Sequence, residues 1–254
     1  MTLIYDTESL LRRYLTKLVR NPTLLATNLV TPLLFLFLFS QLLQKLSIFP
    51  GVFSNYLTYL TPGIVILNAM TSATLSGVSM VNDLNSGFLS KMLLTQVSRP
   101  AILLGRLLTD VSIAVVQSII TIVVAIGMGV VFVTGFPGIL LILATVAFFE
   151  LALSGIFLAI GMRSRKTETI SAIGSVLFFP LIFVSSAMFP TAFFPAWAQT
   201  ISRYNPVSYA SDVARGLVQG GLTWSTLASA YMVIGFIALA TIAATLYQFR
   251  KVIS

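Results

Sequence analysis

The sequence predicts an all-α fold: a polytopic membrane protein with six transmembrane helices, an N-terminal amphipathic interfacial helix, and short re-entrant helices between the fifth and sixth spans. Of its 254 residues, 57 % are hydrophobic and only 9 % are charged, whereas soluble domains carry roughly 25 % charged residues. The apolar residues form blocks long enough to cross a bilayer core about 30 Å thick. These blocks lack the two-residue alternation of a membrane barrel, so the spans are expected to be helices.

Six apolar blocks have the required length. Five contain no charged residue, and one carries Glu150 at its centre. The spans are expected at residues 24–43, 62–81, 111–133, 138–162, 170–188 and 227–249. A short connection around residues 134–137 joins the third block to the fourth, which predicts an antiparallel hairpin.

The basic residues predict the orientation. Twelve Lys and Arg residues fall on one side of the six spans, and three fall on the other side, namely Lys45, Arg203 and Arg215. Because Lys and Arg gather in cytoplasmic loops, both termini are expected in the cytoplasm, with the chain in a bacterial or archaeal cytoplasmic membrane. The net charge of +8 then suits a membrane surface, and no nucleic acid is expected as a partner.

The whole chain, 1–254, is interpreted as one transmembrane domain in two parts. Residues 1–22 place leucines at helical spacing opposite four basic side chains, which predicts a helix on the inner membrane surface. Such a helix serves either as a topology anchor or as a docking element. The remaining residues, 23–254, form the six-helix bundle.

A second amphipathic helix is predicted in the cytoplasmic segment 82–100. Its apolar stripe consists of Leu84, Phe88, Leu89, Met92, Leu93 and Val97. Pro100 ends or restarts the helix. Beyond it, Arg106 and Asp110 stand four residues apart and are able to pair near the inner interface.

The outer segment 189–221 is too apolar for an ordinary solvated loop and is broken by three prolines. This pattern predicts two short helices, one on each side of Asn205 and Pro206. They either dip back into the bilayer or form an interfacial belt anchored by aromatic side chains such as Trp197 and Tyr209.

No catalytic residue and no metal site are predicted. The chain contains no Cys and no His, so it lacks the usual transition-metal ligands and imidazole bases. It also has no G-x-x-x-x-G-K-[ST] run that would hold the phosphates of ATP. We therefore expect a chain that is not an enzyme and binds no cofactor itself, so that any ATP is used through a partner.

Two segments resemble those of ABC-2 type permeases, the daunorubicin-resistance-like membrane subunits among them. They are GFLSKMLLTQVSRPAILLGRLLTD on the inner side and FPTAFFPAWAQTISRYNPVSYASDVARG on the outer side, and the likeness in order and spacing covers essentially the whole chain. The resemblance implies the permease subunit of an exporter for a hydrophobic or amphipathic substrate, such as a drug, a lipid or a lipid-linked glycan. It also implies a homodimer in membrane lipid that carries out alternating access, driven by a separate ABC nucleotide-binding ATPase subunit that holds ATP and Mg.

The resemblance further implies roles for individual residues. Coupling to the ATPase subunit falls on two inner segments, namely Gly87, Phe88, Leu89, Lys91, Met92 and Leu93, and Arg163, Arg165 and Lys166. The outer helices carry Trp197, Asn205, Pro206, Tyr209 and Arg215. Polar residues in the spans are candidates for a substrate pathway, although helix packing explains Ser and Thr equally well; they are Asn28, Thr31, Asn68, Thr71, Ser72, Glu150 and Ser185.

Glu150 leaves alternatives open. A carboxylate at mid-bilayer costs about 2.5–3.5 kcal/mol on insertion scales, so Glu150 is expected to face protein or water. A structural role would bond it to Ser154 or to a neighbouring helix. A functional role would make the chain a proton-coupled secondary transporter. An intramembrane enzyme would need a second catalytic group, which the spans do not offer.

Overall fold

The computed structural model describes residues 3–19, 22–43, 55–94 and 98–253, and all regular structure in these ranges is helical. The helices follow the chain as α1 (Leu3–Val19), α2 (Pro22–Leu42), α3 (Tyr56–Asn85), α4 (Phe88–Leu93), α5 (Arg99–Gly127), α6 (Gly135–Ser164), α7 (Thr167–Phe183), the short η2 (Thr191–Phe193), α8 (Ala196–Tyr204), α9 (Pro206–Gln219) and α10 (Trp224–Ile253).

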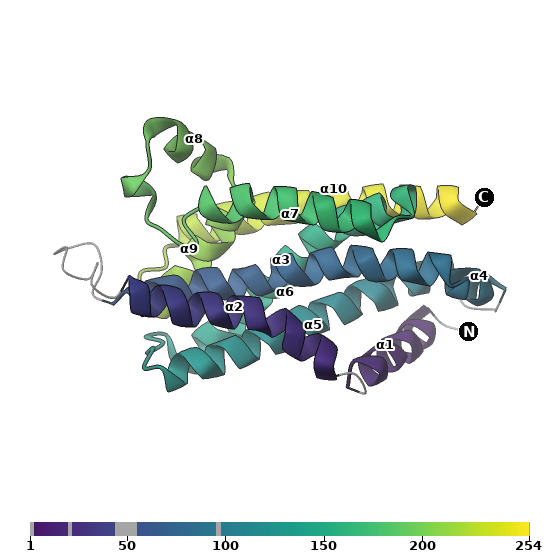
Figure 1. Cartoon of the computed structure of the whole chain (residues 1–254), viewed down its shortest axis with the longest axis horizontal. Helices are drawn as coiled ribbons and strands as arrows, with labels where there is room; N and C mark the ends of the chain where they lie inside the picture. Colours follow the sequence, from purple (N-terminus) through teal and green to yellow (C-terminus); the bar gives the residue numbers. More distant parts are fainter. Residues whose placement is uncertain (1–2, 20–21, 44–54, 95–97, 254) are drawn as a thin grey trace.

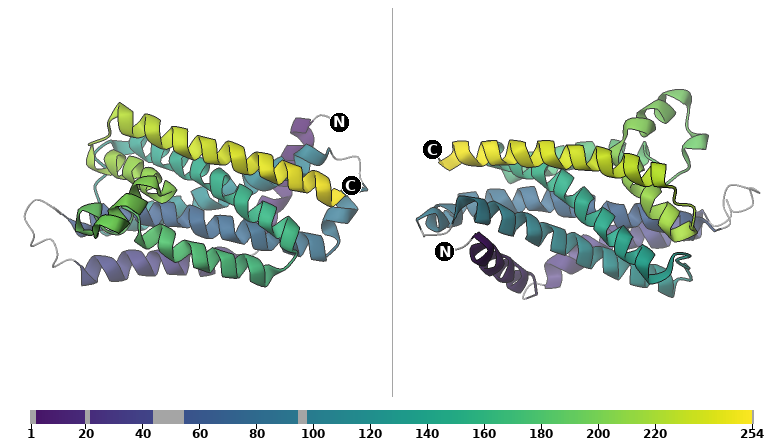
Figure 2. Two further views of the ribbon diagram at one scale, coloured as in Figure 1. Left: turned by 90° about the horizontal axis from the view of Figure 1, so that it is seen from above. Right: turned by 180° about the vertical axis from the view of Figure 1, so that it is seen from behind.

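The long helices lie side by side as a bundle (Figure 1). α6 packs between α3 and α10, and α3 also contacts α2, α5, α7 and α9. Both termini, together with α1 and α4, lie at one end of the bundle, and α8 and α9 lie at the other (Figures 1 and 2). We call these the inner and outer ends. The predicted cytoplasmic location of both termini requires such a common end, and it stays a prediction.

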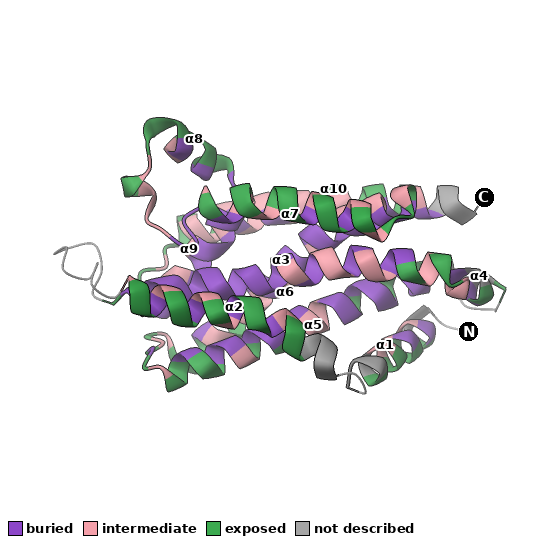
Figure 3. Ribbon diagram, in the orientation of Figure 1, coloured by how far each residue is buried: buried purple, intermediate pink, exposed green. Residues whose placement is uncertain are grey.

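The chain is a polytopic helical membrane protein. Within the described ranges, four helices are long and apolar enough to cross a membrane, namely Tyr56–Asn85, Pro100–Gly127, Gly135–Ser164 and Trp224–Phe249. α2 and α7 are shorter apolar helices on the outside of the bundle. Burial is concentrated on α3 and α6, whereas the outward faces of α2, α7 and α10 are exposed (Figure 3). Large exposed apolar side chains such as Phe37, Phe179 and Phe236 suit contact with hydrocarbon.

α5 begins twelve residues before the predicted start of the third span, at Arg99 instead of residue 111. Pro100 occupies the first turn of this helix, where its missing N–H costs nothing. Arg106 and Asp110 do not end the helix because they are buried and paired with each other. The helix of the fifth span ends earlier than predicted, since α7 ends at Phe183 and not at residue 188.

The short amphipathic helix predicted within 82–100 is present as α4, but it covers only Phe88–Leu93. α3 continues to Asn85, and Gly87 with φ of 68° separates it from the one-and-a-half-turn helix α4. Glycine adopts this left-handed conformation without the steric penalty of a Cβ. The predicted stripe is thus divided between two helices, and Val97 lies outside the described residues.

Candidate functional site

The first candidate site is the inner cluster, in which α4 packs on α1 and on the inner ends of α3 and α5. Leu89 and Met92 are buried in a group that includes Leu10, Met80 and Ile102. The guanidinium of Arg13 on α1 lies over the Phe88 ring, 4.0 Å from its centroid, a favourable cation–π contact. One face of α4 is therefore fixed to the bundle.

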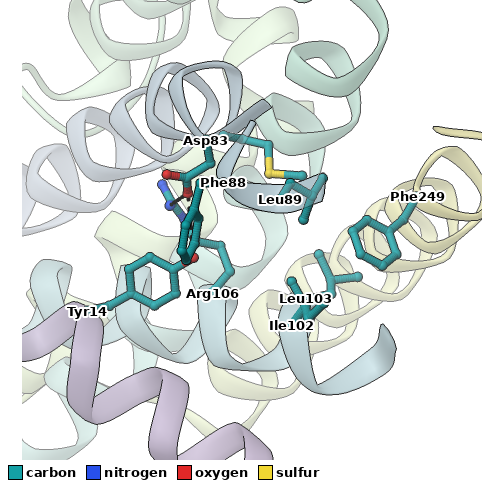
Figure 4. Close-up of a pocket in the computed structure, with 9 residues that line it drawn as sticks. Tyr14, Asp83, Phe88, Leu89, Ile102, Leu103, Arg106 and Phe249 are labelled. Atoms are coloured by element: carbon teal, nitrogen blue, oxygen red, sulfur yellow. Dashed lines mark hydrogen bonds and ion pairs between the residues drawn. The ribbon is translucent and has the colours of Figure 1, made fainter. Parts of the chain in front are cut away.

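Arg106 joins three helices in this cluster (Figure 4). Its Nη1 donates to Asp83 Oδ2 on α3 at 3.0 Å, and its Nε donates to Asp110 Oδ2 on α5 at 3.3 Å. Its Nη2 donates to the backbone carbonyl of Ser76 at 3.1 Å. The guanidinium also lies 5.4 Å from the ring centroid of Tyr14 on α1. The predicted Arg106–Asp110 pair is confirmed, whereas the Asp83 partner was not predicted.

Asp83 and Tyr14 connect this ion network to α4. Asp83 lies in the last turn of α3, directly before the chain turns at Gly87 into α4. The Tyr14 hydroxyl donates to Asp83 Oδ2 at 3.5 Å, and burial raises the pKa of Tyr14. Tyr14, Asp83, Phe88 and Arg106 line one small cavity (Figure 4). A displacement of α4 would therefore act directly on side chains that hold α1, α3 and α5 together.

The residues expected to couple to an ATPase subunit divide into two groups. Leu89 and Met92 are buried and Phe88 is partly covered, so they anchor α4. The exposed residues at the inner end are Lys91, Arg163, Arg165 and Lys166, joined by Leu94, which is 89 % exposed. The side chain of Leu93 lies outside the described residues.

The two inner segments lie close to each other. Asn85, at the end of α3, donates its side-chain amide to the backbone carbonyl of Arg165 in the turn between α6 and α7, at 3.4 Å. Arg165 adopts a left-handed conformation with φ of 54° as the residue after α6. The exposed basic residues of this turn therefore lie at the same end of the bundle as α4.

The second candidate site is the outer return, α8 and α9 with the segment 184–188. The two helices meet at Asn205 and Pro206, as predicted. Asn205 caps α9 by accepting the Val207 N–H at 2.9 Å, and its amide donates to the carbonyls of Leu181 at 2.8 Å and Val184 at 3.0 Å. α9 is largely buried among α3, α6 and α10, whereas Trp197 on α8 is 63 % exposed and Tyr209 is half-buried.

Arg215 holds the segment 184–188 in place. Its Nη1 donates to Asp212 at 2.7 Å, and its Nη2 donates to the carbonyl of Ser186 at 2.5 Å. Its guanidinium lies 3.9 Å from the centroid of the Tyr59 ring on α3. The hydroxyl of Tyr59 donates to Ser186 O at 2.8 Å, and that of Tyr56 donates to Met188 O at 2.9 Å. The tyrosines and Asp212 were not among the predicted site residues.

The structure brings only part of the predicted substrate pathway together. Asn68, Ser72 and Glu150 are buried between α3, α5 and α6. The other candidates lie elsewhere, with Asn28 and Thr31 on α2, Thr71 donating to carbonyls of its own helix, and Ser185 buried at the outer return.

Glu150 was predicted to bond either to Ser154 or to a neighbouring helix, and the bond to Ser154 is not formed. The Ser154 hydroxyl donates to the carbonyl of Leu151 at 3.4 Å instead. Neither carboxyl oxygen of Glu150 has a hydrogen-bond partner within the described residues.

Comparison with known proteins places this arrangement in a family. The model of the ABC-2 type transporter family matches residues 5–219, from α1 to the end of α9. The chain belongs to the ABC-2 type transporter family. The resemblance inferred from the two sequence segments is thus confirmed, and both candidate sites lie inside the matched range of this ABC-2 type permease.

Individual relatives support this family assignment. The ABC-2 permease is 28 % identical over 203 residues to the daunorubicin resistance ABC transporter permease protein DrrB1 of Streptomyces coeruleorubidus, with 78 % of the chain and 70 % of that protein covered. It is 30 % identical over 214 residues to the putative transport permease ycf38 of Cyanophora paradoxa, with 82 % and 72 % covered. The probable doxorubicin resistance ABC transporter permease protein DrrC of Mycobacterium tuberculosis is 24 % identical over 213 residues, with 82 % and 75 % covered.

Proposed function

We propose that this permease is the membrane half of an exporter whose energy comes from a separate ABC nucleotide-binding ATPase subunit, which binds ATP and Mg. The permease itself hydrolyses nothing. Its part is to change conformation when the ATPase subunit changes shape, since a partner that binds two conformations with different affinity shifts the balance between them.

Six helices would cross the membrane: α2, α3, α5, α6, α7 and α10. α2 has 21 residues and spans about 32 Å at the usual helical rise. α7 has 17 residues and spans about 26 Å, slightly less than the hydrocarbon core. The irregular segment 184–188 completes this crossing, and backbone of that kind is tolerated at membrane depth because α3 and α9 cover it. α9 would be a re-entrant helix.

The inner end would face the cytoplasm. Arg12, Arg13 and Lys91 are exposed there, together with the basic turn between α6 and α7, and an excess of Lys and Arg marks the cytoplasmic side. Both termini would then be cytoplasmic, with α1 at the inner surface of the cytoplasmic membrane.

The main support for this proposal is that α4 has one buried face and one exposed face. One face of this helix is anchored through Leu89, Met92 and Phe88, whereas Lys91 on its other face and Leu94 directly after the helix are exposed. Docking on the exposed face would push α4 against the Arg106 network and so act on α1, α3 and α5 together. We therefore assign the ATPase contact to Gly87, Lys91 and Leu94 with the turn 163–166, and assign an anchoring role to the buried residues.

The substrate would be hydrophobic or amphipathic. Two relatives bear the names of daunorubicin and doxorubicin resistance proteins, which supports a drug-like molecule, with lipids and lipid-linked glycans in the same chemical class. α7 presents exposed aromatic rings at Phe179 and Phe183, stacked 6.1 Å apart. A second copy of the chain would complete the route as a homodimer, and alternating access would occur between the two copies.

The test is affinity purification of the full chain from its own membranes, followed by identification of any ATP-binding cassette subunit that accompanies it. The double variant Lys91→Glu with Leu94→Asp is expected to lose most of this subunit. Tyr204→Asp is the matched control, because Tyr204 is 80 % exposed at the outer end. Retention of the subunit by the double variant contradicts the assignment. Transport that continues without any ATPase and collapses in Glu150→Gln establishes the proton-coupled alternative.

A further inference from the structure

Three buried polar side chains at the centre of the bundle carry atoms that are unpaired within the described residues. Asn68 on α3, Gln117 on α5 and Glu150 on α6 are each fully buried. Five of their side-chain atoms have no hydrogen-bond partner within the described structure: Asn68 Oδ1, Gln117 Nε2 and Oε1, and Glu150 Oε1 and Oε2. Buried polar atoms are almost always hydrogen-bonded to protein or ordered water. Five unpaired atoms in one region therefore indicate a bound water or ligand.

The contacts between helices place the three side chains in one layer. The Ser72 hydroxyl donates to the carbonyl of Asp110 at 3.3 Å. One turn further along α3, the Asn68 amide donates to a threonine hydroxyl four residues after Gln117, at 3.0 Å. The hydroxyl of Ser118, the residue after Gln117, donates to the carbonyl of Val65 at 3.4 Å. Gln117 therefore lies level with the stretch of α3 from Val65 to Asn68. Glu150 reaches the same level from α6, because the backbone of Phe157 lies against Gly77 of α3. α3 and α6 run in the same direction, and Met70 and Glu150 each lie seven residues before this contact.

The described residues offer Glu150 no positive charge in this layer. Arg106 is already bound by Asp83 and Asp110. The other titratable groups described on α6 and on the helices packed against it are Tyr56, Tyr59, Arg163, Glu168, Tyr209, Asp212, Arg215, Tyr231 and Tyr247. Within the described residues, no Lys or Arg forms an ion pair with Glu150. An ionised Glu150 would therefore be a buried charge with no counterion among them.

We propose that this layer is a buried water site in which Glu150 carries a proton. A protonated carboxyl group both donates and accepts hydrogen bonds, and the Gln117 amide does the same. A water molecule needs two to four polar partners, which the five unpaired atoms supply. With this proton bound, Glu150 would be uncharged inside the membrane. This inference does not depend on the identity of the energy source or of the transported substrate.

Infrared difference spectroscopy on the full chain in lipid nanodiscs tests the proton. Subtracting the spectrum of Glu150→Gln from that of the wild type is expected to leave the C=O stretch of a protonated carboxylic acid, unchanged across the neutral pH range. Glu168→Gln is the matched control, because Glu168 is exposed at the start of α7 and should lose only carboxylate bands. If Glu150→Gln also loses only carboxylate bands, the proposal is overturned.

Two further measurements test the water. Gln117→Leu is expected to remove the O–H stretch of an internal water and to shift the Glu150 C=O band. If the water band is absent from the wild type, the site does not hold water. Thermal unfolding midpoints in Na⁺ and in K⁺ are expected to be equal and independent of salt identity. A midpoint that rises with one cation in the wild type, but not in Glu150→Gln, would show a cation site and overturn the proposal.

Discussion

Replacing Arg106 with methionine removes the cation that joins α1, α3 and α5. The side chain is 7 % exposed, and its partners Asp83 and Asp110 are 14 % and 4 % exposed. Removing the guanidinium leaves both carboxylates beside each other without compensation. Removal of one partner from a buried ion pair typically costs about 3–5 kcal/mol, which is a large part of a total stability of roughly 5–15 kcal/mol.

The loss of stability should result from the unpaired carboxylates and not from the altered shape of the side chain at position 106. When Arg106→Met is combined with Asp83→Asn and Asp110→Asn, no charge remains buried. Removing every member of the network avoids the cost of an unpaired buried charge, and replacement of a buried ion network by well-packed hydrophobic residues is often close to neutral in stability. We therefore expect the triple variant to recover at least half of the free energy lost in the single variant.

The assay is the free energy of unfolding in mixed micelles, with Arg163→Met as the control. Arg163 is exposed at the inner end, and surface substitutions of this kind change stability by about 0.5 kcal/mol or less. If Arg106→Met costs no more than Arg163→Met, or if the triple variant is less stable than the single one, Arg106 does not organise the inner cluster.

Three further predictions concern the outer return. A Cβ on Gly63 would lie 2.1 Å from the carbonyl oxygen of Ala187, so Gly63→Ala is expected to lower stability by about 1–3 kcal/mol through overpacking; Gly127→Ala, which meets nothing within 4 Å, is the control in the same unfolding assay. Asn205→Ala removes a helix cap and two amide hydrogen bonds, with an expected loss of about 2–4 kcal/mol. Asn205→Asp keeps the cap acceptor and should lose less, and equal losses in the two variants would contradict the role of the amide. Arg215→Lys retains the charge but loses the planar two-sided contact, so the segment 184–188 should exchange its amide hydrogens faster, and unchanged exchange would refute the locking role.

Features that depend on nearby residues were predictable from the sequence. The places of the long helices along the chain follow from the apolar blocks, the break at Asn205 and Pro206 follows from local turn chemistry, and Arg106 with Asp110 is a one-turn pair. The start of α5 was placed too late because buried charge normally marks the end of a span. The charge is tolerated here because Asp83, which is 23 residues distant along the chain, completes the pairing.

Long-range contacts account for most of what the sequence did not reveal. Nothing in the local pattern of Arg215 points to Tyr59 on α3, which comes close only because α9 folds back into the bundle. The orientation of α4 was partly visible, since Leu89 and Met92 lie on the apolar stripe. An apolar stripe identifies a helix face that must be buried, but it does not say whether the bundle or another protein buries it.

Photo-crosslinking from position 94 most directly tests whether the inner end of this permease receives an ATPase. Leu94 is 89 % exposed beside α4, and Tyr204 is 80 % exposed at the opposite end. A photoreactive residue at position 94 should crosslink to an ATP-binding cassette subunit in intact membranes, and the same residue at position 204 should not. Crosslinking from 204, or from neither position while transport continues, would contradict an energy input at α4.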